Sequence, residues 1–321
     1  CVDTSIFLPF TGSLTIDSSF VLDINTAGIC NTDSVVLSKS VFSCPDTGQN
    51  IVTVTTYYSN GLVKICDAIV TVYDSISPYA ACMDTTIYLN STGHFTIDSG
   101  YVHDTTIISC GTVSMVLDKY NFNCGDLGPN QVSVVVTEIS GLKDTCQAIV
   151  TVRDSIPPVS VCKDTTVYLN SLGQISIDST SLENGSSDNC GIASIILSKS
   201  NFECSDLGRN VIWMIVQDID GNKDSCQGTV TVMDTIPPSV NCKDTTLYLN
   251  SSGSFTITNS FVINGASDNC IVDSIWLSKY NFGCSDLGMD SVYLFAKDGV
   301  GNSDTCRGVI TILDTIPPIA I

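Results

Sequence analysis

The chain has 321 residues, and its 33 acidic side chains against 13 basic ones give a net charge of -20. This excess of negative charge repels phosphate backbones and anionic headgroups, which argues against nucleic acid and membrane surfaces as partners. No apolar run approaches the roughly 18 residues that a membrane-spanning helix needs. The sequence also begins without a signal-peptide pattern.

Sixteen cysteines reveal an internal repeat. In the last three of four sets each cysteine recurs after 80 residues, and the first set differs by one residue inserted before Cys30. We therefore expect four domains, at 1–81, 82–161, 162–241 and 242–321, called copies one to four. The sequence covers four periods in phase, so we expect it to be a segment of a longer array whose export signals lie outside it.

Each copy gives the same succession of predicted elements. It starts with CxDTTxYLNSxGxxxI, continues through a polar loop (ending in SDNC in the last two copies) to LSKxNFxCxDLG, and then reaches an alternating run, DxxGNxDxC and VTVxDTIPP. These short runs are rich in Val, Ile, Thr and Tyr, alternate with period two, and are separated by Gly, Asn, Asp and Pro. The pattern predicts an all-β fold of four tandem immunoglobulin-like β-sandwich repeats of about 80 residues, with two disulfides each.

Strand alternation predicts which side chains are buried. We expect Val132, Val134 and Val136 to be core, like their counterparts in copies three and four. The opposite parity points bulky apolar residues outward, and a patch of this kind usually marks a contact. A covering strand, loop or glycan, or a register shifted by one residue, would also account for it. The predicted contact face consists of Ile196, Trp213, Ile215, Trp276, Tyr293 and Phe295.

The cysteines favour structural disulfides over a zinc or redox site, because their number is even and no CxxC pair occurs. Disulfides on this scale persist in oxidising surroundings, so we expect an extracellular location. Four cysteines allow three pairings, of which a nested one is the simplest. Each bond would contribute roughly 2–4 kcal/mol to the stability of a copy. The predicted pairs are Cys1–Cys66, Cys30–Cys44, Cys82–Cys146, Cys110–Cys124, Cys162–Cys226, Cys190–Cys204, Cys242–Cys306 and Cys270–Cys284.

The segment DIDGNKD places oxygen-bearing side chains at alternate positions around Gly221, as a tight calcium loop requires. In an immunoglobulin-like sandwich this loop lies beside the SDNC loop and the preceding linker. Turn formation by Asp, Asn and Gly is the alternative explanation. Copies one and two, with Asn60 or with Asp74, Glu138 and Asp144, should bind weakly or not at all. The predicted ligands are Asp154, Asp188, Asn189, Asp218, Asp220, Asn222 and Asp224 before copy three, and Asp234, Asp268, Asn269, Asp298, Asn302 and Asp304 before copy four.

Catalytic motifs are missing from the sequence: it has no GxSxG, P-loop or HExxH segment. Both histidines, His94 and His103, lie in copy two and do not recur. We therefore expect no catalytic residues and no enzyme activity in these repeats.

The segments NGSSDNCGIASIILSKSNFECSDLG and DTIPP resemble the hyalin-repeat-like (HYR-like) modules of Bacteroidota surface adhesins. The resemblance covers all four copies and implies immunoglobulin-like sandwiches in cell-surface adhesins, gliding adhesins or fibres exported by a type IX system. The usual hyalin repeat has two cysteines, so the inner pair rests on this sequence alone.

Recurrent Asp-Ser/Thr-aliphatic or Asp-Ser/Thr-Thr triplets resemble the O-glycosylation signal of secreted Bacteroidota proteins. Repetition of one turn motif explains them equally well. The candidate acceptors are Ser34, Ser75, Thr85, Thr105, Ser155, Thr165, Ser179, Thr235, Thr245, Ser274, Ser291 and Thr315.

Two functions from different classes remain open. The first is a structural and adhesive stalk or fibre of the cell surface, stiffened by disulfides and calcium, that binds other copies of itself or a surface or glycan ligand. The second is a carbohydrate-binding or accessory module of a secreted enzyme. That module would need an aromatic platform on one copy and a catalytic domain elsewhere in the gene.

Overall fold

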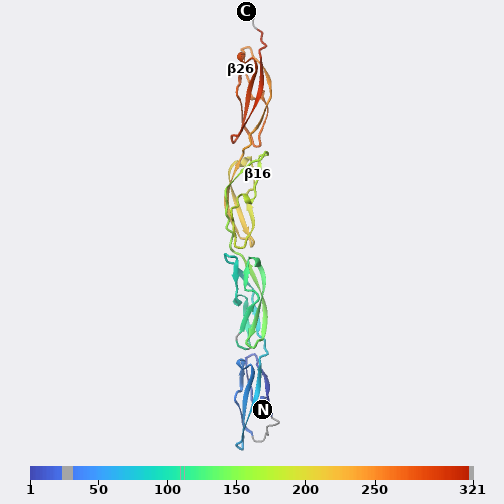
Figure 1. The fold of residues 1–321 in the computed structure, drawn as a ribbon, viewed down its shortest axis with the longest axis vertical. Helices are drawn as coiled ribbons and strands as arrows, with labels where there is room; N and C mark the ends of the chain where they lie inside the picture. The colour runs from blue at the N-terminus through green and yellow to red at the C-terminus, as the bar shows by residue number, and fades with distance from the viewer. Residues whose placement is uncertain (24–31, 109, 112, 318–321) are drawn as a thin grey trace. The chain divides into compact units, whose positions relative to one another are not determined.

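A computed structural model describes residues 1–23, 32–108, 110–111 and 113–317. As predicted, the chain is all-β and consists of tandem immunoglobulin-like repeats of about 80 residues (Figure 1). Within the described residues the helical segments are short 3-10 turns. The chain divides into two compact units, Cys1–Ile156 and Pro157–Ile321, each containing two copies of the repeat.

The strands of the first unit are β1 (Thr4–Phe7), β2 (Ser13–Thr15), β3 (Thr32–Leu37), β4 (Val41–Ser43), β5 (Gly48–Tyr58), β6 (Val63–Tyr73), β7 (Tyr79–Cys82), β8 (Thr85–Tyr88), β9 (His94–Thr96), β10 (His103–Ile107), β11 (Val113–Leu117), β12 (Asn121–Asn123), β13 (Gly128–Glu138) and β14 (Lys143–Arg153). Its 3-10 turns are η1 (Ser18–Phe20), η2 (Cys44–Asp46), η3 (Ser99–Tyr101) and η4 (Cys124–Asp126).

The second unit contains β15 (Thr165–Tyr168), β16 (Gln174–Ser176), β17 (Ile192–Leu197), β18 (Asn201–Glu203), β19 (Gly208–Asp218), β20 (Lys223–Met233), β21 (Ser239–Cys242), β22 (Thr245–Tyr248), β23 (Ser254–Thr256), β24 (Ile263–Ser267), β25 (Val272–Leu277), β26 (Asn281–Gly283), β27 (Gly288–Asp298) and β28 (Ser303–Leu313). Its 3-10 turns are η5 (Ser179–Ser181), η6 (Cys204–Asp206), η7 (Asn259–Phe261) and η8 (Cys284–Asp286).

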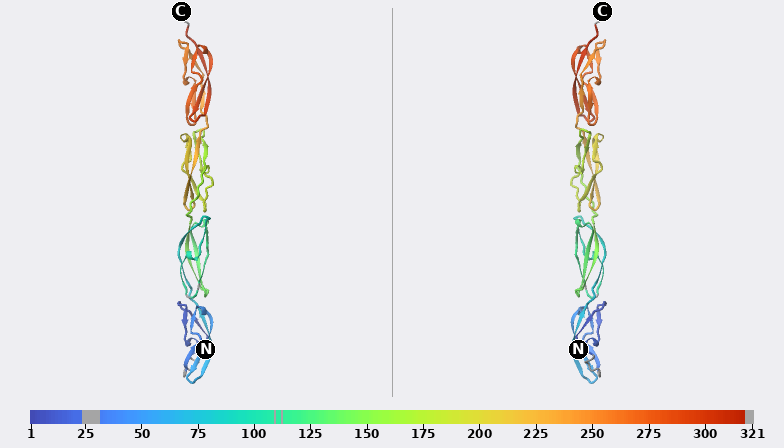
Figure 2. Two further views of the ribbon diagram at one scale, coloured as in Figure 1. Left: turned by 90° about the vertical axis from the view of Figure 1, so that its left-hand side faces the viewer. Right: turned by 90° about the vertical axis from the view of Figure 1, so that its right-hand side faces the viewer.

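Copy four illustrates the topology of a repeat (Figure 2). Its main sheet has the strand order β22-β28-β27-β25, in which β22 runs parallel to β28 and the other neighbours are antiparallel. The ladders β21–β24 and β23–β26 form the second layer. The 11-residue strands β27 and β28 make the long hairpin at the centre of the main sheet.

The core lies between the two layers and follows the predicted alternation. Val132, Val134 and Val136 are fully buried, as are the equivalent residues of copies three and four. The phenylalanine of the NF motif, Phe282 in copy four, enters the core from the short strand β26. The outward parity is also as predicted, since Trp213 is 46% exposed and Trp276 is 39% exposed.

The predicted domain boundaries remain predictions, and two strands run across them. Strand β7 pairs with β10 of copy two, and β21 pairs with β24 of copy four. The residues immediately before the first cysteine of these copies thus belong to the sandwich that follows them. Linker residues 234–238 separate β20 from β21 in the second unit.

Candidate functional site

The outer disulfide forms in all four copies as predicted. It joins the first cysteine to the fourth and closes a span of 64 or 65 residues, and in copy four it links β21 of the second layer to β28 of the main sheet. The bonds are Cys1–Cys66, Cys82–Cys146, Cys162–Cys226 and Cys242–Cys306.

The predicted inner pairing is wrong. The third cysteine of one copy bonds to the second cysteine of the next copy, as in Cys44–Cys110 and Cys204–Cys270. Cys124 and Cys190 are disulfide-bonded too, whereas Cys284 is a free, exposed thiol. Three predicted pairs are therefore wrong: Cys110–Cys124, Cys190–Cys204 and Cys270–Cys284. The predicted pair Cys30–Cys44 is also wrong, because Cys44 bonds to Cys110; Cys30 lies outside the described residues.

The strand geometry explains this correction. Between the second and third cysteines of copy four lie β25, which has 6 residues, and β26. A strand rises about 3.3 Å per residue, so β25 alone carries the chain about 20 Å. Disulfide-bonded cysteines need Cα atoms within about 7 Å. Cys270 and Cys284 therefore lie towards opposite ends of the sandwich, and Cys270 bonds to Cys204 of the preceding copy.

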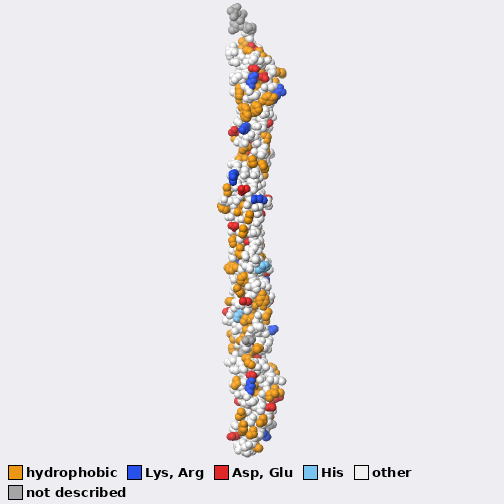
Figure 3. Space-filling model, turned by 60° about the vertical axis from the view of Figure 1, so that its left-hand side comes forward, with side chains coloured by type: hydrophobic (Ala, Val, Ile, Leu, Met, Phe, Trp, Pro, Cys, Tyr) orange, Lys and Arg blue, Asp and Glu red, His pale blue; other side chains and the backbone are white. Residues whose placement is uncertain are grey.

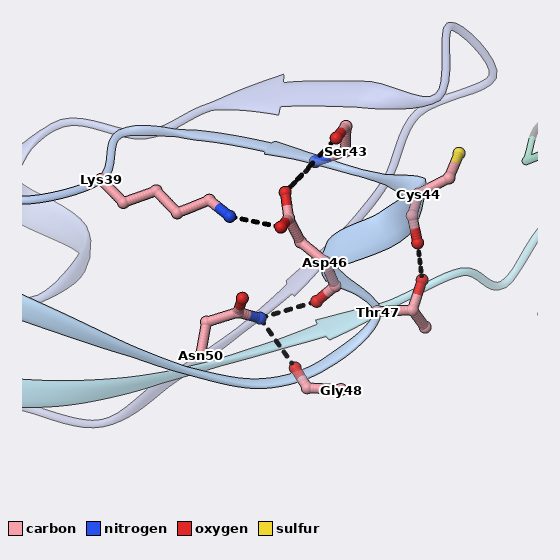
Figure 4. Close-up of polar contacts among 7 residues, drawn as sticks. All are labelled: Lys39, Ser43, Cys44, Asp46, Thr47, Gly48 and Asn50. Atoms are coloured by element: carbon pink, nitrogen blue, oxygen red, sulfur yellow. Dashed lines mark hydrogen bonds and ion pairs between the residues drawn. The ribbon is translucent and has the colours of Figure 1, made fainter.

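A polar network builds the loop that carries the third cysteine (Figure 4). In copy one the ammonium group of Lys39 pairs with the Asp46 carboxylate. The second carboxylate oxygen of Asp46 accepts from the backbone N–H of Ser43 at 2.9 Å. The Asn50 side chain donates to the backbone carbonyl of Asp46 at 2.6 Å and to that of Gly48 at 3.2 Å. We call this segment, residues 39–50, the Lys–Asp loop.

The Lys–Asp loop recurs in every copy. Lys119 pairs with Asp126 at 2.5 Å and Lys279 with Asp286 at 2.6 Å. In copy four Asp290 takes the place of the asparagine and adds a contact to Lys279 at 2.9 Å. The lysine also lies 4.8–5.3 Å above the ring of the buried phenylalanine. The LSKxNFxCxDLG motif is therefore structural, and it places the third cysteine at the start of a 3-10 turn.

A glycine turn completes the surface around the third cysteine of copy three. Gly173 has a φ of 72° and its carbonyl lies 3.7 Å from the sulfur of Cys204. A Cβ atom at Gly173 would lie 2.5 Å from the Asn269 carbonyl oxygen and 2.7 Å from that sulfur. The side-chain amide of Asn269 in turn donates to the Asn170 carbonyl at 3.4 Å. Only glycine fits here, because both φ and the approach of copy four exclude a side chain.

Three carboxylates converge beside this disulfide. Asp234 comes from the linker, Asp268 from the loop before Cys270, and Asp298 from the end of β27. They bring ligand oxygens within 4.8 Å of one another. Asp234 is 5% exposed and Asp298 is 2% exposed. The sequence prediction that these three elements meet at the junction is consistent with this placement.

Several oxygens of the cluster have no hydrogen-bond donor. In Asp234 one carboxylate oxygen accepts from the Ile236 backbone at 3.0 Å and from Asn269 at 3.1 Å, but its Oδ2 is buried and unpaired. In Asp268 the Oδ2 atom accepts from Cys270 at 2.9 Å and Oδ1 is buried and unpaired. The Oδ1 atom of Asn269 is also buried and unpaired. A buried carboxylate oxygen is costly unless a cation or a hydrogen-bond donor reaches it.

Asp298 is held ionised by its own turn. Burial raises its pKa, but the Asn302 side chain and the backbone N–H groups of Gly301, Asn302 and Val300 lower it more, so the pKa lies below its ordinary value. Asn302 donates at 2.7 Å to Asp298 and at 3.2 Å to the carbonyl of Asp234, which ties the turn to the linker. Its amide therefore holds the cluster together through its N–H groups.

Two of the predicted ligands have a different role. Asp304 accepts from the backbone N–H of Val240 at 3.1 Å, and Asp224 accepts from that of Ser160 at 2.9 Å. Each carboxylate thus fixes the chain just before the first cysteine of its copy. The bonds from Ser160 also lower the pKa of Asp224. Asp220 lies half-buried in the turn after β19 and is not one of the clustered carboxylates.

The residues predicted before copy three adopt the same local bonds in their own units. Asp154 accepts from Ile156 at 3.0 Å, as Asp234 does from Ile236. Asp188 accepts from Cys190 at 2.8 Å, and Asp218 from Gly221 at 2.7 Å. Asn222 donates to Asp218 at 2.7 Å, and Asn189 is half-buried beside Cys190.

The described residues at the junction between the first two copies have other partners, and the predicted gradation in calcium binding stays a prediction. Asp144 is used to hold the backbone of Ala80 at 2.9 Å, Asp74 accepts from Ile76 at 3.2 Å, and Asn60 accepts from Leu62 at 3.1 Å. Glu138 is buried. Among the described residues of copies one and two, no cluster of three acids or histidines forms around these side chains.

The predicted contact face is exposed on the outer side of the main sheet. Trp276 and Phe295 are cross-strand partners, and their rings stack with centroids 5.4 Å apart. Ile196 is paired with Ile215 in the same way in copy three. Tyr293, two residues before Phe295 on the same strand, is 46% exposed. Figure 3 shows hydrophobic side chains along one face of the molecule between isolated charged ones.

The aspartates of the glycosylation triplets have structural partners. Asp84, Asp164 and Asp244 each precede Thr-Thr and accept a backbone N–H from the neighbouring strand at 2.7–2.8 Å. The linker aspartates Asp234 and Asp154 accept from the isoleucine two residues later. Repetition of structural motifs thus accounts for these aspartates.

Comparison with known proteins finds a relative that matches only part of the chain. No family model matches the sequence. Hyalin of Strongylocentrotus purpuratus is 30% identical over 201 residues, which cover 58% of this chain and 16% of hyalin. The chain therefore spans less than a fifth of the length of that relative.

Solved structures of tandem immunoglobulin and cadherin domains are similar at low sequence identity. Sidekick-1 immunoglobulin domains 1-5 match at a TM-score of 0.37 and 9% identity, covering 97% of this chain and 79% of that one. Drosophila N-cadherin EC1-4 matches at 0.30 and 10%, covering 98% and 99%. Titin domains I67-I69 match at 0.35 and 13%, covering 74% and 100%. No helix in the described part of this chain is long and apolar enough to cross a membrane.

Proposed function

We propose that the chain is a structural segment of an extracellular surface protein, in which a disulfide and a calcium ion hold consecutive repeats together. The observation that carries this proposal is the Cys204–Cys270 bond, which joins the third cysteine of one repeat to the second of the next. This crosslink restricts motion and separation of the two repeats, which is useful in a stalk, adhesin or fibre.

The chemistry of the chain supports an extracellular location. Disulfides of this number survive only in oxidising surroundings. The negative charge of -20 suits a solvated surface protein and disfavours contacts with nucleic acid or anionic lipid. Attachment to the cell surface, export by a type IX system and O-glycosylation belong to the same proposal and rest on the resemblance to HYR-like modules. An intact mass of native material above that of the bare polypeptide would support glycosylation, and an equal mass would contradict it.

Calcium is the cation that suits the cluster formed by Asp234, Asp268 and Asp298. The ligands are hard oxygens, three of them carboxylates, and the Asn269 amide oxygen is buried beside them. Calcium accepts 6–8 oxygens in flexible geometry, so carbonyls and water can complete the shell. Magnesium requires a stricter octahedron and gives up water reluctantly. Without a cation, three negative charges would lie together at a largely buried site.

Calcium titration tests this proposal. At a free calcium concentration a hundred times the dissociation constant, binding should stabilise the fold by about 2.7 kcal/mol. We expect chelator to lower the melting temperature, and Asp234→Asn to remove one ion from the stoichiometry measured by calorimetry. Asp74→Asn is the matched control, because its linker position is equivalent but it belongs to no acid cluster among the residues that the structure describes. An unchanged melting temperature in chelator and no heat of binding would contradict the calcium site.

A binding role of the aromatic face is a second candidate, favoured by the stack of the exposed Trp276 on the half-buried Phe295. Such a platform suits a sugar ring or the surface of another chain, so it fits both the adhesive role and a carbohydrate-binding accessory module. Trp213→Ser and Trp276→Ser should reduce self-association or retention on a glycan column, with little change in melting temperature. A large loss of stability would instead show that the rings belong to the core.

A further inference from the structure

The end of copy four carries the same set of groups that copy three uses to receive copy four. Cys284 corresponds to Cys204, Gly253 to Gly173, and Asp314 to Asp234, each shifted by 80 residues. Asn250 corresponds in the same way to Asn170. At copy three these four positions contact or lie beside the next repeat.

The four groups of copy four already have the conformation seen at the formed junction. The sulfur of Cys284 lies 3.6 Å from the Gly253 carbonyl, and Gly253 has a φ of 70°. A Cβ atom at Gly253 would lie 2.7 Å from that sulfur, the distance also found at Gly173. Asp314 accepts from Ile316 at 3.0 Å, which repeats the bond of Asp234 to Ile236. The Lys–Asp loop that supports the cysteine is formed as well.

The difference between the two ends is exposure. Asp234 is buried and Cys204 half-buried, whereas Asp314 and Cys284 are exposed. Gly173 is buried and Gly253 is half-buried. The groups of copy four therefore have the conformation of a formed junction but are exposed, and the Cys284 thiol is free.

We propose that this surface is one half of a junction and receives another immunoglobulin-like repeat that carries Asp-Asn-Cys in the loop equivalent to the one between β24 and β25. Residues 268–270 of this chain show the chemistry of such a partner. Its cysteine forms a disulfide with Cys284, and its aspartate joins Asp314 as a second carboxylate. The inference extends the proposed role of the junctions, but the disulfide does not require calcium.

The disulfide forms by two exchange steps. The Cys284 thiolate attacks a low-molecular-weight disulfide and releases one thiol, and the cysteine of the incoming repeat then displaces the second thiol. Two protein thiols are oxidised and one small disulfide is reduced to two thiols. The secretory and extracellular surroundings proposed above supply oxidants of this class.

The test uses the whole chain with residues 242–321 repeated directly after Ile321, which continues the 80-residue period. Both proteins are refolded with glutathione and glutathione disulfide, alkylated without denaturant and mapped by mass spectrometry. We expect Cys284 to be alkylated in the original chain. In the extended chain its alkylation should fall at least about tenfold, because a tethered partner acts at roughly millimolar effective concentration. The peptide map should then join Cys284 to the second cysteine of the added repeat.

Two controls keep the result interpretable. Replacing the second cysteine of the added repeat by Ser should restore alkylation of Cys284. Formation of the outer disulfide within the added repeat shows that this repeat has folded. If it does not fold, a second extended chain, in which residues 162–241 replace the added copy of residues 242–321, is tested in the same way. Cys284 that stays free, or pairs elsewhere, beside a folded added repeat would overturn the proposal. Performing the reaction in chelator separates this outcome from failure of the calcium site.

Discussion

Removal of the Cys204–Cys270 crosslink should destabilise the second unit without disturbing either core. We consider Cys204→Ser combined with Cys270→Ser, because the double substitution leaves no new free thiol. The bond closes a span of 66 residues. Loop-closure entropy for that span amounts to about 4 kcal/mol at 25 °C when both repeats unfold. The unit covers Pro157–Ile321, a size at which 1 kcal/mol shifts the melting temperature by about 2–4 °C.

We therefore expect the double variant to melt about 8–16 °C lower than the original chain in the transition assigned to copies three and four. Differential scanning calorimetry measures this, with calcium held constant. Cys284→Ser is the matched control, since it alters an equivalent loop that forms no disulfide and should leave the melting temperature unchanged. A shift below about 2 °C would refute the entropic argument. A peptide map of the original chain that joins Cys190 to Cys204 would refute the connectivity itself.

Two other perturbations test the junction and the Lys–Asp loops. Gly173→Ala should weaken the contact between copies three and four and slow formation of the Cys204–Cys270 bond during refolding, because the new Cβ would collide with the Asn269 carbonyl. Timed alkylation measures the rate of bond formation, and Gly48→Ala is the control, since Gly48 also has a positive φ but has open space around it. Equal rates in the two variants would contradict the steric argument. Acid should destabilise the chain, because ion pairs with lysine hold the pKa values of Asp46, Asp126, Asp206 and Asp286 below the ordinary 3.8. These pairs stabilise the fold at pH values above 3.8 and lose their contribution as the pH falls through the lower folded-state pKa values. Lys199→Met should flatten the acid limb of the denaturant midpoint plotted against pH, and an unchanged acid limb would show that the pairs contribute nothing.

The repeated sequence by itself determined the fold class, the strand faces and the outer disulfides. Period-two alternation reports burial directly, so Val134 and Met214 were correctly placed in the core, and Trp276 was correctly placed on the outer face. The first cysteine lies near the start of each copy and the fourth lies in the last long strand, so their pairing is the simplest closure of a sandwich. The groups at the junction were also foreseen in part, because the linker, the Asp-Asn-Cys loop and the last hairpin turn lie at one end of an immunoglobulin-like sandwich.

Tertiary structure alone decided what the second and third cysteines do. A fixed period gives the same spacing whether a cysteine bonds within its own copy or in the next, so the sequence cannot distinguish the two. The direction of β25 and the reach of a disulfide settle it, because the strand separates Cys270 from Cys284 and brings Cys270 to Cys204. Structure likewise separated the clustered carboxylates of Asp234, Asp268 and Asp298 from Asp304, whose oxygen is used by the backbone of Val240. Both sets are Asp residues in turn-rich sequence, and only their positions in space show that one set forms a cluster of carboxylates and the other holds a strand.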